Sequence, residues 1–151
     1  MTNEKIISSF SGDYAFLSNS YLWKFNYKGD WYPSAEHAYQ AAKTFDPKLK
    51  WQIRVAATPK IAKQLGKTVP LIPMWDEINV GIMFEILLCK FITITGSKLT
   101  EKLIDTYPNK LIEGNTWGDT YWGMVYNENT KKWVGQNKLG RLLMLIREMR
   151  R

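Results

Sequence analysis

The stretch YPSAEHAYQAAKTF, residues Tyr32 to Phe45, combines a helix start with the only histidine of the chain and a glutamate beside it. Ser34 follows a proline, and a serine in this position accepts hydrogen bonds from the first free N–H groups of a helix. We therefore predict a helix that is capped by Ser34 and runs to about Phe45. Its alanines offer one smooth side for packing, which leaves the polar residues to another face.

The polar face of this helix carries an acid, an amide, a phenol and an amine. Glu36, Gln40 and Lys43 are spaced i, i+4 and i+7, so they share one face, and Tyr39 lies beside them. The face is either a binding site or a solvated surface. The second alternative needs no ligand, because an acid in the first turn stabilises a helix by roughly a few tenths of a kcal/mol. His37 is either an acid–base group or a hydrogen-bonded structural residue, and the structural role is favoured.

The rest of the chain reads as further short helices and a few strands. A hairpin is predicted over residues 23–32 with a turn at Lys28-Gly29-Asp30. The other predicted elements are helices over 46–57, 58–66 and 76–94, a Gly96-Ser97 separator before KLTEKLIDTY, a strand at 111–112, a hairpin or pair of edge strands within 123–135 and a last helix from about Leu139. We predict an α+β fold that is mainly helical, with a few short antiparallel strands, in a single domain over residues 1–151.

Composition narrows the function classes. The net charge of +7 and the pI near 9.4 favour an anionic partner such as nucleic acid or a phosphorylated metabolite, although a solvated basic helix face gives the same charge. The longest apolar run is too short to span a bilayer, no secretory signal is visible, and the single cysteine allows no internal disulfide. We therefore predict a cytoplasmic location and no membrane partner.

The sequence shows neither a metal-ligand spacing nor a nucleotide-binding glycine motif. One histidine, one cysteine and unclustered carboxylates argue against a zinc site. Neither GxxxxGK[ST] nor GxGxxG occurs. We expect no metal and no cofactor, and the sequence leaves the oligomeric state open.

A second candidate site lies in LIEGNTWGDTYWGMV, residues 111–125. Glu113 ends the predicted strand, and Asp119 lies in a loop between Trp117 and Trp122 whose glycines allow close backbone approach. An acid between two indoles on such a loop is costly unless a ligand binds there. The alternative is an ordinary turn in which Asp119 caps local N–H groups.

A third candidate lies at the start of the last helix, in VGQNKLGRLLMLIR. Gly135, Asn137 and Gly140 surround the helix start, where N–H groups and Arg141 could cradle a phosphate. Asn137 could equally be a plain N-cap.

Six segments, taken in order, resemble the NADAR family of YbiA-like N-glycosidases. They are FLSNS, YPSAEHAYQAAKTF, ATPKIAKQLG, WDEINVGIMFEILLCKF, LIEGNTWGDTYWG and GQNKLGRLLMLIR, and they span about Phe10 to Arg147. Two positions depart from the family pattern: Ser20 replaces a common Phe, and Met124 replaces a common Gly. The change at Met124 would reshape the loop near Trp122.

The resemblance implies a metal-free N-glycosidase, and it assigns roles residue by residue. Glu36 would be the catalytic carboxylate, with Lys43 and Asp119 as the other catalytic groups. The substrate-binding residues that it implies are Asn19, His37, Tyr39, Gln40, Trp75, Lys90, Glu113, Trp122, Gly123 and Asn137.

The resemblance also implies two substrate classes. Family members remove ADP-ribose from guanine bases, some as antitoxins against DNA-modifying ADP-ribosyltransferases, or they cleave early intermediates of riboflavin synthesis. The charge of +7 favours ADP-ribosylated nucleic acid, DNA in particular, over a phosphorylated ribosyl metabolite. A module that binds ADP-ribose or nucleic acid without chemistry is the alternative of another class.

Overall fold

The computed structural model describes residues 4–92 and 97–151. It divides into two compact units, each of which is described by itself. The central unit comprises residues 19–93, and the terminal unit comprises residues 1–18 together with 94–151. A single domain over residues 1–151 stays a prediction.

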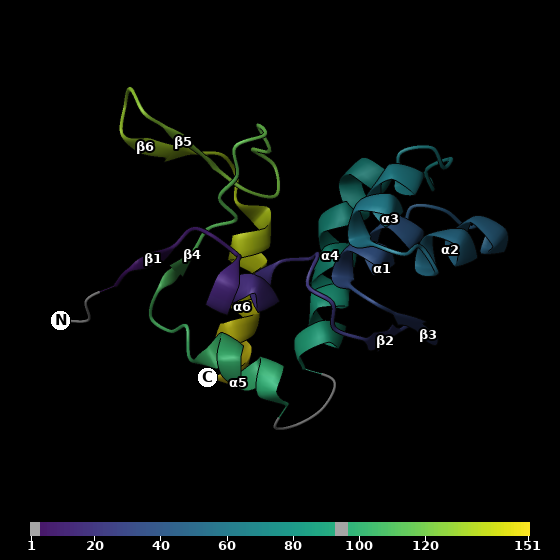
Figure 1. Cartoon of the computed structure of the whole chain (residues 1–151), viewed down its shortest axis with the longest axis horizontal. Coiled ribbons are helices and arrows are strands. Elements are labelled where there is room, and N and C mark those ends of the chain that lie inside the picture. The colour runs from purple at the N-terminus through teal and green to yellow at the C-terminus, as the bar shows by residue number, and fades with distance from the viewer. Residues whose placement is uncertain (1–3, 93–96) are drawn as a thin grey trace. The chain divides into compact units, whose positions relative to one another are not determined.

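The central unit is a β-hairpin followed by four helices (Figure 1). Its elements are β2 (Phe25–Tyr27), β3 (Asp30–Tyr32), α1 (Ala35–Ala41), α2 (Pro47–Arg54), α3 (Pro59–Gly66) and α4 (Trp75–Phe91). The predicted caps are confirmed: the Asp46 side chain accepts from two N–H groups of α2, and Thr58 accepts from the N–H of Ile61 in α3. A proline follows each cap, where its missing N–H costs the helix nothing.

The predicted hairpin is also confirmed, with a tighter turn than expected. Phe25 pairs with Tyr32 and Tyr27 pairs with Asp30, so Asp30 belongs to the strand and not to the turn. Only Lys28 and Gly29 connect the strands, at φ 52° and 91°. Two consecutive residues with positive φ suit the right-handed twist of a hairpin.

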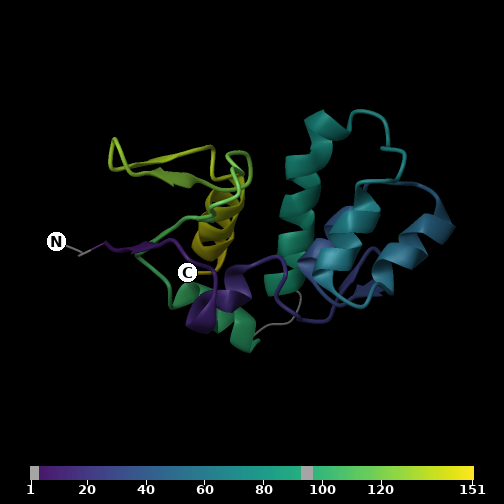
Figure 2. The ribbon, with the colours of Figure 1, turned by 45° about the horizontal axis from the view of Figure 1, so that its top comes forward.

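Helix α1 packs against the three other helices of the central unit (Figure 2). Ala35, Ala38 and Ala41 are fully buried and recur every three residues, so one side of α1 presents no bulky side chain. The polar residues of α1 are therefore held within a packed layer of helices.

Helices α1 and α2 end earlier than the sequence predicts, because the residues that follow them form hydrogen bonds with other segments. Helix α1 stops at Ala41 instead of Phe45, and the carbonyl of Lys43 accepts from Ile72 N–H at 2.8 Å. Helix α2 stops at Arg54 instead of Ala57, and the carbonyl of Ala56 accepts from a ring nitrogen of His37. The predicted end of the long helix at Ile94 and the separator residue Gly96 lie outside the described residues.

The terminal unit combines short strands with two α-helices and one 3-10 helix among its described residues. Its elements are β1 (Ile6–Ile7), η1 (Gly12–Leu17), α5 (Lys98–Ile104), β4 (Lys110–Leu111), β5 (Val125–Asn127), β6 (Lys132–Val134) and α6 (Lys138–Arg150). Strands β5 and β6 form the predicted antiparallel hairpin, but β1 pairs with β4 in parallel. The prediction of antiparallel strands is wrong for that pair, because β1 comes from the N-terminal segment and not from a neighbouring hairpin arm.

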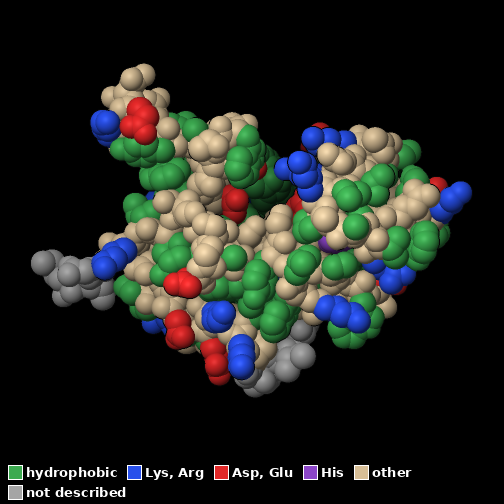
Figure 3. Space-filling view, in the orientation of Figure 1, with side chains coloured by type: hydrophobic (Ala, Val, Ile, Leu, Met, Phe, Trp, Pro, Cys, Tyr) green, Lys and Arg blue, Asp and Glu red, His purple; other side chains and the backbone are tan. Residues whose placement is uncertain are grey.

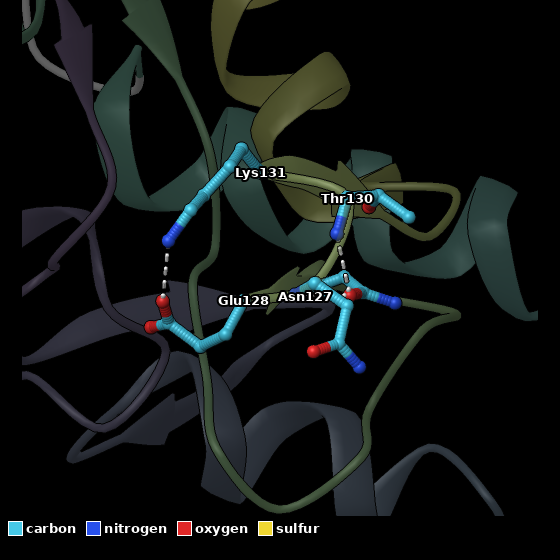
Figure 4. A network of polar contacts seen from close by, with 5 residues as sticks. Asn127, Glu128, Thr130 and Lys131 are labelled. Carbon is cyan, nitrogen blue, oxygen red and sulfur yellow. Dashed lines mark hydrogen bonds and ion pairs between the residues drawn. The ribbon is translucent and has the colours of Figure 1, made fainter.

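The tip of the β5–β6 hairpin is held by side-chain hydrogen bonds and an ion pair (Figure 4). Asn127 Oδ1 accepts from Asn129 N–H and Thr130 N–H, and Lys131 Nζ lies 3.6 Å from a carboxylate oxygen of Glu128. These groups are exposed, so they order the turn but add little stability.

Helix α6 supplies the apolar stripe of the terminal unit. Leu139, Leu143 and Ile146 are spaced i, i+4 and i+7 and are buried. The helix contacts β4 and α5. Helices predominate and the strands are short, which confirms the predicted α+β class.

Candidate functional site

Glu36 lies in the first turn of α1, with one carboxylate oxygen already held. Ser34 caps the helix by accepting from His37 N–H at 3.2 Å, and Glu36 N–H donates to the Asn19 carbonyl at 2.9 Å. The side chain is half-buried, and its Oε1 accepts from Gln40 Nε2 at 3.0 Å. The carboxylate is therefore oriented by its neighbour one turn along the helix.

Lys43 continues the same face as a half-buried amine. Its ammonium lies 5.6 Å from the centroid of the Tyr39 ring and forms no ion pair within the described ranges. Burial lowers the pKa of Lys43 from its ordinary 10.5, and the positive charges of Lys63 and Lys67 lower it further. The carboxylate of Glu36 acts in the opposite direction on this pKa. The charge of Glu36 thus offsets part of the lowering of the Lys43 pKa.

An aromatic pair lies next to Lys43. The ring of Tyr39 packs against Trp75, the first residue of α4, with 5.2 Å between centroids and a tilt of 52°. Both residues are buried. Lys43 thus contacts the Tyr39 ring on one side, and a tilted Trp75 ring packs against the same tyrosine.

His37 is bound at both ring nitrogens and is 1% exposed. Its Nε2 lies 3.0 Å from the Ala56 carbonyl, which only accepts, so Nε2 carries the hydrogen. Its Nδ1 lies 2.7 Å from Ser34 Oγ. The ring links the start of α1 to the end of α2, which matches the favoured structural interpretation. A substrate-binding role for His37 stays a prediction.

Asn19 and Lys90 complete the candidate residues of the central unit. Asn19 Nδ2 donates to Met83 Sδ at 3.6 Å, while its Oδ1 is buried and has no hydrogen-bond partner in the part of the chain that the structure describes. Lys90, in the last turn of α4, is 2% exposed and places its ammonium 5.0 Å from the ring centroid of Phe91 and 5.8 Å from that of Tyr21. The structure links Asn19 to Glu36 through a backbone hydrogen bond.

In the terminal unit, Asp119 caps its own loop. Its Oδ1 accepts from Tyr121 N–H and Trp122 N–H, both at 3.0 Å, which is the local-cap interpretation of this loop. Its backbone is held by Asn115, which accepts from Asp119 N–H at 2.9 Å and donates to the Asp119 carbonyl at 2.8 Å. No hydrogen bond to Oδ2 is present among the described residues, so that oxygen is available to a ligand.

Glu113 and Gly123 lie on adjacent segments of this loop. Met124 N–H donates to the Glu113 carbonyl at 2.9 Å, and a Cβ at Gly123 would overlap that carbonyl. Gly123 is therefore needed for close backbone approach, as its spacing predicted. Asn137 Oδ1 accepts from Glu113 N–H at 3.0 Å, and this bond ties the loop to α6.

The N–H groups at the start of α6 bind the 120–123 loop. Asn137 makes no capping bond and instead donates to the Leu111 carbonyl at 2.9 Å. Lys138 N–H and Leu139 N–H donate to the carbonyls of Tyr121 and Trp122. Asn137 occupies the N-cap position of α6 without a capping bond, and the 120–123 loop already uses N–H groups that a phosphate would need, so a phosphate site here stays a prediction.

The two tryptophans of the loop differ in exposure. Trp117 is 69% exposed, whereas Trp122 is half-buried and packs edge-on against Tyr121 at 5.1 Å. Lys138 Nζ lies 4.2 Å from the Tyr121 ring centroid. Trp122 is thus part of an ordered aromatic and cationic cluster, while Trp117 projects from the loop.

The sequence prediction missed two asparagines. Asn115 organises the 113–124 loop through both of its side-chain atoms, and Asn79 is buried on α4, one turn after Trp75. The spacing Asn115-x-x-x-Asp119 carries a signal for a local turn. For Asn79, only its place on the apolar stripe of a helix marks a buried polar group.

The chemistry available differs between the units. The central unit offers a carboxylate, an amine of lowered pKa and an aromatic pair, which suits proton transfer next to a stacked ring. Within residues 4–92 and 97–151, no group of three or more His, Cys, Asp or Glu side chains is close enough to bind a metal. None of the helices in those ranges combines the length and hydropathy of a bilayer span.

Comparison with known proteins gives one consistent match. The family model described as NADAR domain matches residues 5–151. The chain is 35% identical over 142 residues to N-glycosidase YbiA of Shigella boydii, covering 93% of this chain and 84% of that protein. It is 31% identical over 138 residues to a riboflavin biosynthesis protein of Vibrio vulnificus, covering 90% of this chain and 35% of that protein. The NMR structure of Escherichia coli YbiA superposes with a TM-score of 0.80 at 33% identity and covers 99% of this chain and 86% of that one.

Proposed function

The chain belongs to the NADAR domain family, and we propose that it is an N-glycosidase that hydrolyses the bond between ribose C1 and an amine nitrogen. The observation that carries this proposal is an oriented carboxylate in the first turn of α1 and an amine of lowered pKa at Lys43, just beyond the end of that helix. Relatives that are named N-glycosidases support the same reaction class.

In the proposed mechanism, Glu36 is the general base. The C1–N bond breaks and its electron pair leaves with the nitrogen, while positive charge develops at C1. The carboxylate stabilises this charge and takes a proton from the attacking water, whose oxygen bonds to C1. The proton then passes to the departing amine, so one water is consumed for each bond cleaved. Acid–base help of this kind contributes roughly 10²–10⁴-fold to the rate.

The aromatic groups and Asp119 have separate proposed roles. Trp75 and Trp122 would stack on the base or on adenine, as indoles do on flat π systems. Asp119 would use its Oδ2 toward the substrate while Oδ1 keeps the loop closed. Asn19 and Lys90 are proposed to bind substrate, the former through its unpaired Oδ1.

The proposed substrate is ADP-ribose attached to guanine in DNA, which would make the chain an antitoxin against a DNA ADP-ribosyltransferase. The support is the net charge of +7, since each neutralised phosphate strengthens binding to DNA. Figure 3 shows Lys and Arg side chains scattered among acidic and apolar ones on the visible face. This face therefore shows no broad basic surface, and it adds no support to the DNA proposal.

The second candidate substrate is an early intermediate of riboflavin synthesis. The observation that favours it is the match over 90% of this chain to part of a protein named for riboflavin biosynthesis. A phosphorylated ribosyl amine of this kind needs the same C1 chemistry, but it needs no extended basic surface.

One experiment separates the three functions. The folded protein is incubated with DNA that carries ADP-ribosylated guanine and, separately, with phosphoribosylamino-pyrimidine intermediates, at about 50 and 200 mM salt. Release of ADP-ribose that weakens at higher salt is expected, because phosphate contacts release counterions. If the protein cleaved the C1–N bond of the riboflavin intermediates but not that of the modified DNA, the function would move to metabolite clearance. Binding without cleavage of either substrate would identify a binding module.

The role of Lys43 can be tested by changing the pH. A charged amine that anchors substrate and a neutral amine that attacks it would give opposite trends as pH rises through the lowered pKa of Lys43. We propose that its ammonium anchors substrate anions, so kcat/KM is expected to fall as pH rises through this pKa, below the ordinary 10.5 of lysine. Lys43→Arg keeps a charge at these pH values and is expected to extend the activity to higher pH. The measurement is kcat/KM from pH 6 to 10.

A covalent role would give the opposite sign. If the neutral amine of Lys43 attacked the opened sugar, the rate would rise with pH and Lys43→Arg would be inactive. Trapping of a protein–sugar adduct by borohydride in the wild type would then replace the anchoring role by a Schiff base.

A further inference from the structure

The side chain of Gln40 is buried between two helices and is directed at Glu36. It is 3% exposed, and its Nε2 donates to Glu36 Oε1 at 3.0 Å. Both residues lie on α1 at i and i+4, so the bond forms within one helix turn. One of the two carboxylate oxygens is thereby fixed before any substrate arrives.

Gly66, the last residue of α3, provides the space for Gln40. A Cβ at Gly66 would overlap Gln40 Oε1, would lie 2.7 Å from Gln40 Cδ and would lie 3.0 Å from Gln40 Cβ. Gly66 does not have a positive φ, so its backbone conformation does not require glycine. Glycine is needed here because any side chain at Gly66 would overlap Gln40 where α3 packs on α1.

The oxygen of the Gln40 amide lowers the stability of the folded protein. Gln40 Oε1 is buried and has no hydrogen-bond partner within residues 4–92 and 97–151. An unpaired buried polar atom is unfavourable, and an apolar side chain of similar size would avoid it. Turning the amide over would place its oxygen against Glu36 Oε1, so only the observed orientation donates to the carboxylate. The amide is therefore useful at this position because of Glu36.

We infer that Gln40 is a positioning residue, which orients the Glu36 carboxylate and is itself held in place by the close approach of Gly66. Gln40 then acts through Glu36 and not through contact with substrate. The kinetic consequence rests on the proposed N-glycosidase function, whereas the geometric consequence does not.

Gly66→Ala and Gln40→Met test this inference from two helices. Each is expected to lower kcat roughly 10- to 100-fold while KM changes little, since misplacing a reacting group by about 1 Å costs up to about 10²-fold. Gly81→Ala is the matched control, because Gly81 lies in α4 and a Cβ there meets nothing within 4 Å. A rise in KM with unchanged kcat would instead assign Gln40 to substrate binding and overturn the inference.

A double variant separates positioning from general damage. In a Gln40→Ala background the two worst overlaps at Gly66 disappear, and of the three nearest contacts only that with Gln40 Cβ at 3.0 Å remains. Adding Gly66→Ala to that background is therefore expected to cost no further kcat. Losses that multiply would show that Gly66 acts independently of Gln40 and would contradict the inference.

NMR of the Gln40 side-chain amide tests the geometry without any substrate. Its two N–H signals are expected to shift in Gly66→Ala and in Glu36→Ala, but not in Gly81→Ala. Unchanged signals in Gly66→Ala would overturn the inference whether or not the wild type cleaves either substrate. If the signals shift but the wild type is inactive, only the proposed function fails.

Discussion

Replacing Glu36 by Gln is expected to lower kcat by roughly 10²–10⁴-fold, the range for loss of a general base. The amide of the new side chain has nearly the same shape and keeps an oxygen that can accept from Gln40 Nε2. It carries no negative charge, so it can neither stabilise a cation at C1 nor take a proton from water. Single-turnover release of ADP-ribose and of the pyrimidine base, measured on the folded variant, checks this result.

Glu101→Gln is the control for Glu36→Gln. Glu101 is an exposed glutamate in the first turn of α5, so its change removes the same favourable interaction with a helix N-terminus. That interaction is worth about 0.3–1 kcal/mol and affects stability alone. If Glu36→Gln and Glu101→Gln retained equal activity on the substrate that the wild type cleaves, the base would have to be another group.

Local signals in the sequence were sufficient for the elements that begin at caps and tight turns. Ser34, Asp46 and Thr58 each cap the helix predicted for them, and the hairpin before α1 forms in the predicted place. These features depend on residues a few positions apart, and their hydrogen bonds form within one turn. The shared face of Glu36 and Gln40 likewise follows from helical spacing alone, whereas Lys43 lies beyond the end of α1.

Tertiary contacts determine what the sequence does not show. The ends of α1 and α2 depend on partners at Ile72 and His37, and the pairing of β1 with β4 joins segments about a hundred residues apart. Gly66 is another example. The sequence predicts that it ends α3, but only the structure shows that it also leaves space for Gln40. Site roles that depend on such contacts require the structure.

Asn137→Ala is expected to destabilise the protein by roughly 3 kcal/mol or more. The side chain accepts from Glu113 N–H and donates to the Leu111 carbonyl, and each buried group left unpaired costs about 1–3 kcal/mol. Asn137 also lies at φ 52° and ψ 42°, where alanine adds about 1–2 kcal/mol of strain. Urea unfolding of both proteins measures the difference.

Three further variants assign the loss in Asn137→Ala to its causes. Asn137→Gly removes the side chain without the backbone strain, so it is expected to lose less stability than Asn137→Ala. Asn137→Asp keeps the acceptor for Glu113 N–H but loses the donor to the Leu111 carbonyl. Asn127→Ala also removes two side-chain-to-backbone bonds, but in an exposed turn where water replaces them, so its cost is expected to stay below about 1 kcal/mol.

The same variants decide between two roles for Asn137. A structural role lowers the free energy of unfolding and leaves KM of the remaining folded protein unchanged, because the Asn137 amide already binds two backbone groups of the 111–113 segment. Gly140 supports this expectation, since a Cβ there would overlap the Leu111 carbonyl and the Asn137 side chain. An Asn137→Ala protein of wild-type stability with a raised KM would instead show that the amide contacts substrate, and the packing around α6 would then need another explanation.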